Sequence, residues 1–210
     1  MIATGTTQQA ATRRQRGRPR QEFPSDEYLA RRNEILDIAT RVFHEKGYEK
    51  GTLEDVAAAT GYRKASLYHY VPSKGHLLYL IFDRAISGAL QRLQEFSTIG
   101  DPARKLEALI RHQAIMVAVE KSLFTVFFDH RPRLERQYEH EIRQKERLYY
   151  QVFVDAVADA ARAGVIAPVD PHYGAQAVLG MASWVYKWFD PDRHGAEAVA
   201  ETMCRLLLAP

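Results

Sequence analysis

Apolar residues recur at three- and four-residue spacing along almost the whole chain after Pro24. The first clear series, which Gly47 ends, comprises Ile35, Leu36, Ala39, Val42 and Phe43. This spacing is typical of a helix that buries one face, whereas a half-buried strand alternates strictly between apolar and polar residues. Because no segment alternates in that way, we expect an all-α fold in which Gly and Pro mark the helix ends.

The composition is that of a globular protein with a sizeable core. Hydrophobic residues make up 46% and charged residues 26% of the 210 residues. The single cysteine, Cys204, excludes an internal disulfide and fits a reducing compartment. The N-terminus lacks the apolar segment of a signal peptide, and no run approaches the ~18 apolar residues of a membrane span. We therefore expect a cytoplasmic protein that does not enter a membrane.

Residues 52–70 are predicted to form two short helices joined by a turn. Thr52 is placed to cap the first helix, with Asp55 as its capping partner three residues later, and Gly61 ends it. The second helix is expected from about Arg63 to Tyr70. Two short helices around a glycine-containing turn form a helix-turn-helix, whose second helix enters the major groove of DNA.

The second short helix carries a mixture of polar and aromatic side chains that suits neither a core nor an ordinary solvated surface. Leu67 is expected to face inward. Lys64 and Ser66 lie at the exposed start, where side chains reach base edges, and Tyr68 and Tyr70 suit phosphates. The DNA contacts predicted from this region are Thr52, Lys64, Ser66, Tyr68, His69, Tyr70 and Lys74.

Positive charge is concentrated at the N-terminal end. Residues 1–80 hold 13 Lys and Arg against 9 Asp and Glu, and five of the arginines lie among the first twenty residues, which contain no acid. A basic arm of this kind favours binding to a polyanion, although a solvated tail is the alternative. The sequence RGRPR at 16–20 is similar to an AT-hook core, which lies in the minor groove. The predicted arm contacts are Arg14, Arg16, Arg18 and Arg20.

Residues 51–78, GTLEDVAAATGYRKASLYHYVPSKGHLL, resemble the DNA-binding region of TetR-type transcriptional repressors. The positions that fit the family pattern are Thr52, Val56, Ala57, Gly61, Leu67, Tyr68, Tyr70, Ser73, Lys74 and Leu78. Val71 replaces the usual Phe, and Gly75-His76 replaces a common Glu-containing pair. The resemblance implies a homodimer that binds a palindromic operator. It also implies a three-helix DNA-binding domain (25–72) and a larger helical ligand-binding and dimerisation domain (73–210). The polar, arginine-rich segment before them, 1–24, is expected from its composition to be a flexible basic arm.

The larger domain is rich in aromatic residues. Taken singly, each aromatic residue at helical spacing is an ordinary core residue, but together they suit a cavity between helices. Arg147 and Lys187 could supply cations for phosphates, although charges along a long helix usually face solvent. The predicted ligand-binding residues are Phe124, Phe127, Phe128, Arg147, Tyr149, Phe153, Trp184, Lys187 and Trp188.

Two segments of the larger domain are similar to the TetR-type repressors of fatty-acid and sterol breakdown. They are RLYYQVFVDAVADAARAGVIAP (147–168) and MASWVYKWFDPDRHGAEAVAETM (181–203). Some members of that group release DNA on binding acyl-CoA thioesters, so the resemblance implies such an effector. Lys187 replaces an Arg of the group's pattern, which keeps the charge but loses the bidentate grip on phosphate. A neutral hydrophobic effector, such as a drug, a lipid or an aromatic compound, is the alternative.

Other classes of function have less support. The sequence has no G-x-S-x-G elbow, P-loop, G-x-G-x-x-G motif or histidine pair four residues apart, so we do not expect an enzyme. Its eight histidines are scattered and Cys204 has no thiol partner, so we expect neither a metal site nor a cofactor. An architectural DNA-binding protein without an effector is the alternative from another class. It predicts little preference among DNA sequences.

Overall fold

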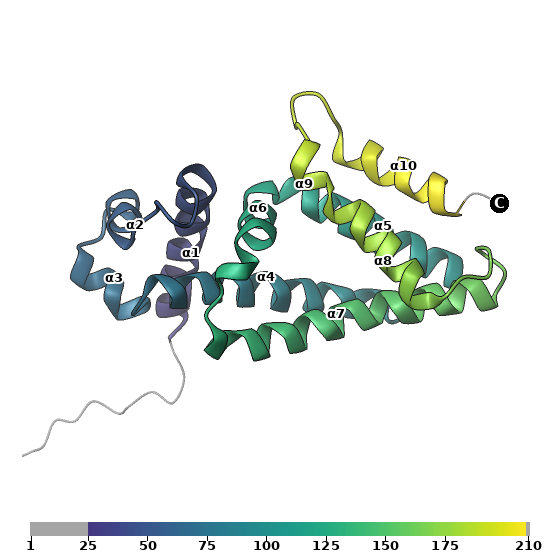
Figure 1. The fold of residues 1–210 in the computed structure, drawn as a ribbon, viewed down its shortest axis with the longest axis horizontal. Helices are drawn as coiled ribbons and strands as arrows, with labels where there is room; N and C mark the ends of the chain where they lie inside the picture. Colours follow the sequence, from purple (N-terminus) through teal and green to yellow (C-terminus); the bar gives the residue numbers. More distant parts are fainter. Residues whose placement is uncertain (1–24, 209–210) are drawn as a thin grey trace, which may run out of the picture.

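The computed structural model describes residues 25–208, which form helices joined by short loops, with no strand in that range (Figure 1). The all-α expectation is therefore confirmed. Three helices, α1 (Asp26–Lys46), α2 (Leu53–Thr60) and α3 (Lys64–Tyr70), form one end of an elongated molecule. Within residues 25–208, no helix combines the length and the apolarity needed to cross a bilayer.

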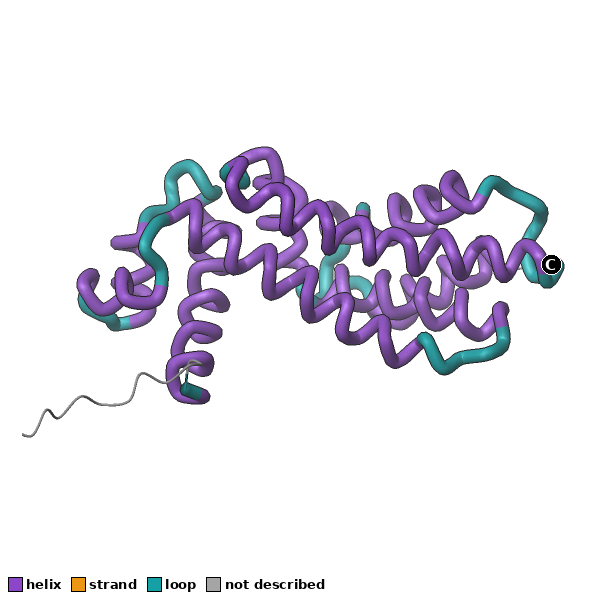
Figure 2. The backbone as a smooth tube through the Cα atoms, turned by 90° about the horizontal axis from the view of Figure 1, so that it is seen from below, coloured by secondary structure: helices purple, strands orange, loops and turns teal. Residues whose placement is uncertain are grey.

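The remaining helices build the larger body. They are α4 (Lys74–Phe96), α5 (Pro102–Val119), α6 (Lys121–His130), the 3-10 turn η1 (Arg131–Arg133), α7 (Arg136–Arg162), α8 (Pro171–Ser183), α9 (Val185–Trp188) and α10 (Ala196–Leu208). The two longest, α4 and α7, run side by side along the molecule (Figure 2). Helix α5 packs against α7, α8 and α10, and α6 packs against α1. The body therefore touches the small N-terminal unit through α4 and α6.

The short helices begin and end at the residues that their sequence indicates. The Thr52 hydroxyl accepts from the backbone N–H of Asp55 at 3.1 Å, and the Asp55 carboxylate accepts from the backbone N–H of Thr52 at 2.9 Å. This reciprocal pair satisfies two backbone donors that the first turn leaves unpaired. Gly61 ends α2 in the left-handed conformation, with φ of 72°. Leu67 is fully buried, so it holds α3 on its neighbours.

Two boundaries in the body differ from the sequence expectation. Pro132 lies in the 3-10 turn η1, and α7 begins only at Arg136. The helical pattern of the sequence continues from 171 to 189 and predicts a single helix there, but the helix is broken after Ser183 and the short helix α9 follows. The break redirects the chain so that Val185 and Tyr186 are buried where α9 meets α5 and α6. Because this gain comes from tertiary packing, no Gly or Pro marks the break in the sequence.

The start of α4 lies tightly against the start of α7. Gly75 is buried there, and a Cβ at this position would overlap the carboxylate of Glu135, the residue that precedes α7. The ring of Tyr79 stacks on that of Tyr138 at 4.4 Å, and Nδ1 of His76 lies 3.1 Å from the Tyr138 hydroxyl. Gly75 therefore leaves room for the Glu135 side chain between the exit of the helix-turn-helix and the start of the longest helix.

Candidate DNA-binding surface and ligand cavity

Helix α3 exposes most of the side chains predicted to contact DNA. Lys64, Ser66, Tyr68 and His69 are exposed on it, while Leu67 between them is fully buried. This arrangement follows from a helix of only two turns that is anchored by one apolar residue. The result is a polar and aromatic ridge of the kind that enters a major groove.

Lys64 is held in place by α2. Its Nζ forms an ion pair with the Glu54 carboxylate and lies 5.9 Å from the centre of the Tyr68 ring. The hydrogen bond that Lys64 donates to the Glu54 carboxylate raises the pKa of Lys64, so Lys64 stays charged at neutral pH. Because both side chains are more than half exposed, DNA phosphates and base edges can compete with Glu54 for the ammonium group.

Tyr70 lies differently from its neighbours on α3. It is half-buried, and its ring stacks on Tyr28 of α1 at 4.9 Å and faces Tyr62 at 6.5 Å. The stack braces α3 against α1, so the ring has a supporting role whatever its hydroxyl contacts.

Thr52 and Lys74, the predicted DNA contacts that flank the helix-turn-helix, already have partners within the protein. The Thr52 hydroxyl accepts from one backbone N–H and donates to the Asp55 carboxylate at 2.9 Å. Lys74 Nζ donates to the backbone oxygen of Glu49 at 3.1 Å and lies 4.4 Å from the centre of the Tyr48 ring. The arm residues Arg14, Arg16, Arg18 and Arg20 lie outside the described residues, and their DNA contacts remain predictions.

A cavity of about 220 Å³ lies inside the body, between α4, α5, α6, α7 and α8. Its lining is largely apolar and aromatic. The residues that line it are Ala85, Ile86, Ala89, Gln113, Met116, Phe124, Phe127, Phe128, Glu146, Tyr149, Tyr150, Leu179 and Ser183. A mostly apolar cavity with a few convergent polar groups is the usual form of a small-molecule site.

Two polar pairs border the cavity. The Tyr149 hydroxyl donates to Oε1 of Gln113, and both residues are buried. Burial raises the pKa of Tyr149, which keeps the hydroxyl protonated. Glu146 accepts from Arg131 in a bidentate ion pair, with distances of 2.8 and 3.1 Å. The cavity therefore offers hydrogen bonds at two points on an otherwise apolar surface.

The structure brings together four of the predicted ligand-binding residues, because Phe124, Phe127, Phe128 and Tyr149 all line the cavity. Phe153 is fully buried behind Tyr149, with the two rings 5.4 Å apart, and is not part of the lining.

The other four predicted residues lie outside the lining. Arg147 is exposed on α7, where its Nε donates to the backbone oxygen of Arg143 at 3.3 Å. Lys187 forms an ion pair with Asp129 at 2.8 Å, which joins α9 to α6. Trp184 and Trp188 are 60% and 43% exposed on the surface of the body.

Sequence reasoning missed Gln113, although the signal is present. Gln113 is a polar residue on the buried face of α5, among Leu109, Ile110 and Val117. A buried polar residue needs a partner or a function. Glu146 was missed for a different reason, since its partner Arg131 is fifteen residues away and no helical spacing connects the two.

Helix α6 connects the cavity to the DNA-binding unit. One side supplies Phe124, Phe127 and Phe128 to the cavity wall, and the helix also packs against α1. Nε2 of His130, its last residue, accepts from the backbone N–H of Tyr48 at 3.3 Å. Helix α6 therefore contacts both the cavity and the N-terminal three-helix unit.

Comparisons with known proteins agree with this arrangement. The family described as bacterial regulatory proteins, tetR family, matches residues 35–79, and a tetracyclin repressor-like C-terminal domain matches residues 100–210. The HTH-type transcriptional repressor KstR2 of Rhodococcus jostii (strain RHA1) is 31% identical over 100 residues, 47% of this chain and 49% of that protein. The match thus spans about half the length of that relative. KstR2 of Mycolicibacterium smegmatis (strain ATCC 700084 / mc(2)155) is 25% identical over 138 residues, 63% of this chain and 67% of that protein.

Solved structures match over most of the chain. The structure of AibR in complex with isovaleryl coenzyme A and operator DNA has 31% identity and a TM-score of 0.80, covering 86% of this chain and 99% of that one. FadR from Bacillus subtilis in complex with stearoyl-CoA shares the fold at 18% identity, with a TM-score of 0.69 and coverage of 84% and 97%. Since the helix-turn-helix and the body are both matched, the chain belongs to the TetR family of transcriptional repressors.

Proposed function

We propose that this repressor acts as a homodimer on a palindromic operator and leaves it when an acyl-CoA thioester binds the body. AibR, with 31% identity, was solved with isovaleryl coenzyme A and operator DNA, which supports both partners. Operator binding places the protein in the cytoplasm, with the DNA. The family consists of DNA-binding regulators and not of enzymes.

The cavity with its buried Gln113–Tyr149 pair is the observation that carries the choice of effector. An acyl thioester needs an apolar space for its chain and a donor for its carbonyl oxygen. The tyrosine uses Oε1 of Gln113, so the amide N–H groups of Gln113 can donate to such a carbonyl. An apolar cavity of about 150 Å³ accommodates a benzene ring, so this one suits an acyl group of about five to eight carbons.

The surface of the body supports a homodimer. Tyr173 on α8 is 78% exposed, Leu206 on α10 is 72% exposed, and Trp184 between α8 and α9 is 60% exposed. Helices α8 and α10 both pack against α5, and Met181 and Leu206 line one groove between them. Exposed apolar residues on such a surface are typical of a protein interface. A dimer built through this face presents two α3 helices to successive major grooves, which requires a separation of about 34–36 Å.

Release from DNA follows from a population shift. Effector binding favours positions of α6 in which Phe124, Phe127 and Phe128 make room for the acyl group. Because α6 packs against α1 and bonds to Tyr48, the favoured position changes the orientation of the helix-turn-helix. The two α3 helices then no longer match both half-sites, and the dimer loses affinity for the operator.

The test begins with selection of an operator from random DNA, followed by fluorescence anisotropy with the full chain. We expect one palindromic sequence to be preferred, and isovaleryl-CoA to lower the operator affinity at least tenfold while CoA alone does not. Gln113→Leu should reduce that response and leave apo operator binding unchanged. Equal operator affinity with and without a bound thioester, shown by calorimetry, contradicts the proposal. Absence of any preferred DNA sequence indicates an architectural protein instead.

A further inference from the structure

We propose that an open cleft between α1 and α4 binds the phosphorylated nucleotide part of the effector while the acyl group occupies the cavity. This inference rests on the proposed function, because it concerns the same ligand. The cavity of about 220 Å³ is too small for a complete CoA thioester, so most of the molecule has to lie elsewhere. The cleft has a volume of about 1050 Å³, which is ample for a nucleotide with its phosphates.

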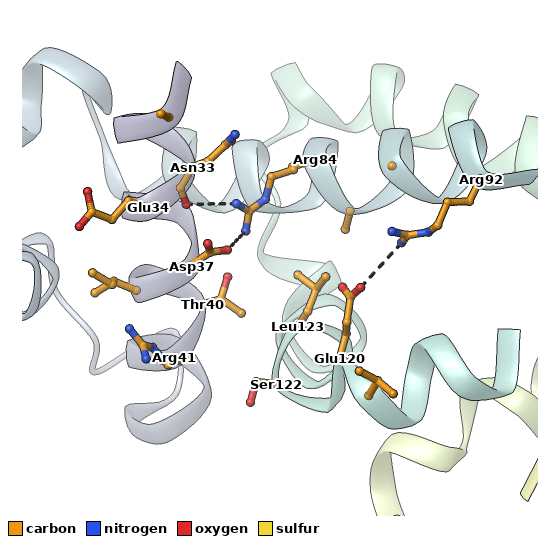
Figure 3. Close-up of a pocket in the computed structure, with 15 residues that line it drawn as sticks. Asn33, Glu34, Asp37, Thr40, Arg41, Arg84, Arg92, Glu120, Ser122 and Leu123 are labelled. Carbon is orange, nitrogen blue, oxygen red and sulfur yellow. Dashed lines mark hydrogen bonds and ion pairs between the residues drawn. The ribbon is translucent and has the colours of Figure 1, made fainter. Parts of the chain in front are cut away.

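Three structural elements form the cleft (Figure 3). Helix α1 provides one wall, α4 provides the second, and the turn from α5 to α6 closes the third side around Glu120 and Ser122. Three arginines line it, Arg41 from α1 and Arg84 and Arg92 from α4. Guanidinium groups are the side chains best suited to bidentate hydrogen bonds with phosphate.

The cleft and the cavity adjoin each other across α4. Ala85 lines both spaces, and Arg92 of the cleft contacts the Met116 sulfur of the cavity wall at 3.3 Å. Gly88 lines the cleft one turn beyond Ala85, and a Cβ added there would meet no atom within 4 Å. Small residues and open space at this point leave room for the narrow arm that joins the thioester to the nucleotide.

The three arginines of the cleft differ in how many hydrogen bonds and ion pairs they already form within the protein. Arg84 donates to the backbone oxygen of Asn33 at 3.1 Å and to the Asp37 carboxylate at 2.5 Å. Arg92 has Glu120 at 3.8 Å, and its Nε is buried without a hydrogen-bond partner. For Arg41, no acidic side chain within residues 25–208 lies at ion-pair distance. Arg41 and Arg92 therefore retain hydrogen-bonding capacity in the absence of a ligand.

The acidic residues of the cleft compete with a bound phosphate for the arginines. Asp37 and Glu120 already face arginines, and Glu34 is turned toward Arg31 and Tyr62. A phosphate group with two negative charges competes with the single charge of Asp37 for Arg84. The Arg84–Asp37 contact joins α4 to α1, so this competition also loosens the DNA-binding unit from the body. The nucleotide part of the effector thereby contributes to release.

The experiment compares two ligands that share one acyl group. Isovaleryl-CoA carries the phosphates, whereas the isovaleryl thioester of N-acetylcysteamine keeps the acyl group and the thioester without them. We expect calorimetry on the full chain to show at least tenfold tighter binding of isovaleryl-CoA, with a difference that shrinks as salt is raised.

Substitutions in the cleft should change the affinity for isovaleryl-CoA but not for the N-acetylcysteamine thioester. Arg41→Gln should weaken isovaleryl-CoA binding about fivefold to tenfold, because a charged hydrogen bond to phosphate is lost. Asp37→Asn should strengthen it, because the competing carboxylate is removed. Neither change should alter binding of the N-acetylcysteamine thioester. Arg162→Gln, at the exposed end of α7, is the matched control and should affect neither ligand.

The outcomes separate this inference from the proposed function. Equal affinity for the two thioesters leaves the acyl site intact and overturns the cleft as the nucleotide site. The cleft is also ruled out if Arg41→Gln and Asp37→Asn change the affinity for both thioesters equally. It is likewise ruled out if both variants raise, or both lower, the affinity for isovaleryl-CoA. If neither thioester binds, the proposed effector and the cleft proposal both fail.

Discussion

The backbone N–H of Tyr48 donates to Nε2 of His130 at 3.3 Å, across 82 positions of sequence. Tyr48 lies in the loop between α1 and α2, and His130 ends α6. The same tyrosine ring lies under the ammonium group of Lys74, at the start of α4. The hydrogen bond therefore stands where the helix-turn-helix, α4 and the ligand-contacting helix α6 meet. It can form only while His130 is neutral, because the protonated ring has no acceptor.

Stability should fall as the pH is lowered through the histidine range. Burial lowers the pKa of His130, and it lowers the pKa of His76 and His112 as well. A group whose folded pKa is depressed takes up its proton first in the unfolded chain. The free energy of unfolding should therefore be highest above about pH 6.5 and decline from there toward the lowered folded pKa. Urea unfolding between pH 5.5 and 7.5 measures this. His130→Gln should flatten the slope, and an unchanged slope would refute the assignment to His130.

Tyr149→Phe should destabilise the fold by about 1–3 kcal/mol, because it leaves the buried Gln113 oxygen without its donor. Tyr150→Phe is the matched control, since the neighbouring hydroxyl donates to the backbone oxygen of His172 at 3.0 Å near the surface. We expect the control to change stability by about 0.5 kcal/mol or less. Urea midpoints of both variants in the absence of ligand provide the comparison, and equal midpoints would show that the buried pair contributes nothing to stability.

Lys64 and Glu54 should affect DNA binding in opposite directions. Lys64→Ala should weaken operator binding and change the base preference, because Lys64 lies at the exposed start of α3. Glu54→Gln should strengthen binding, because the ion pair no longer competes with DNA for Lys64. Glu45→Gln, at an exposed position of α1, removes the same charge but leaves the Lys64–Glu54 ion pair intact, so it controls for net charge. Anisotropy with the operator and with single-base variants tests this. If Glu45→Gln and Glu54→Gln raise the affinity equally, the effect comes from overall charge.

Leu206→Asp should dissociate the proposed dimer. The side chain is 72% exposed on α10, so the change disturbs no monomer core, yet it places a charge on the apolar face. Light scattering after size exclusion should show monomers, and operator affinity should fall in parallel. Leu148→Asp on α7, where the side chain is 61% exposed, is the control and should remain dimeric. A Leu206→Asp protein that stays dimeric would place the interface elsewhere.

Deleting residues 1–20 should weaken operator binding and flatten its dependence on salt. The segment holds five arginines and no acid, and each phosphate contact that is lost reduces the salt slope by about one unit. The measurement is the operator Kd from 50 to 300 mM salt for the full and shortened chains. An unchanged slope would show that the arginine-rich arm makes no phosphate contact.

Local signals predicted the helix boundaries well wherever the determining interaction is local. The Thr52–Asp55 capping pair is such a case. Ser73 and Asp101 cap α4 and α5 through contacts of the same local kind. Glu139 and Arg143 are four residues apart on α7, a spacing that favours an ion pair, and they form one at 3.1 Å. These interactions span three or four residues, so the sequence alone contains both partners.

Features that depend on distant partners could not be predicted in the same way. The break after Ser183 serves to bury Tyr186, whose hydroxyl donates to Asp129 at 2.7 Å from another helix. Aromatic content suggested a cavity, but it could not distinguish Phe124, which lines it, from Trp184, which is exposed. Whether an aromatic side chain faces inward depends on how five helices come together.

The overlap that a side chain at position 75 would cause determines where this protein can be joined to another. A hybrid regulator that takes its DNA-binding domain from a relative is best joined before Gly75, so that the glycine stays with its own Glu135. A splice point after it would bring in the residue of the donor, commonly a larger one, and displace the Glu135 carboxylate from its place beside α4. When DNA-binding domains are exchanged, Gly75 should therefore be kept with the ligand-binding body.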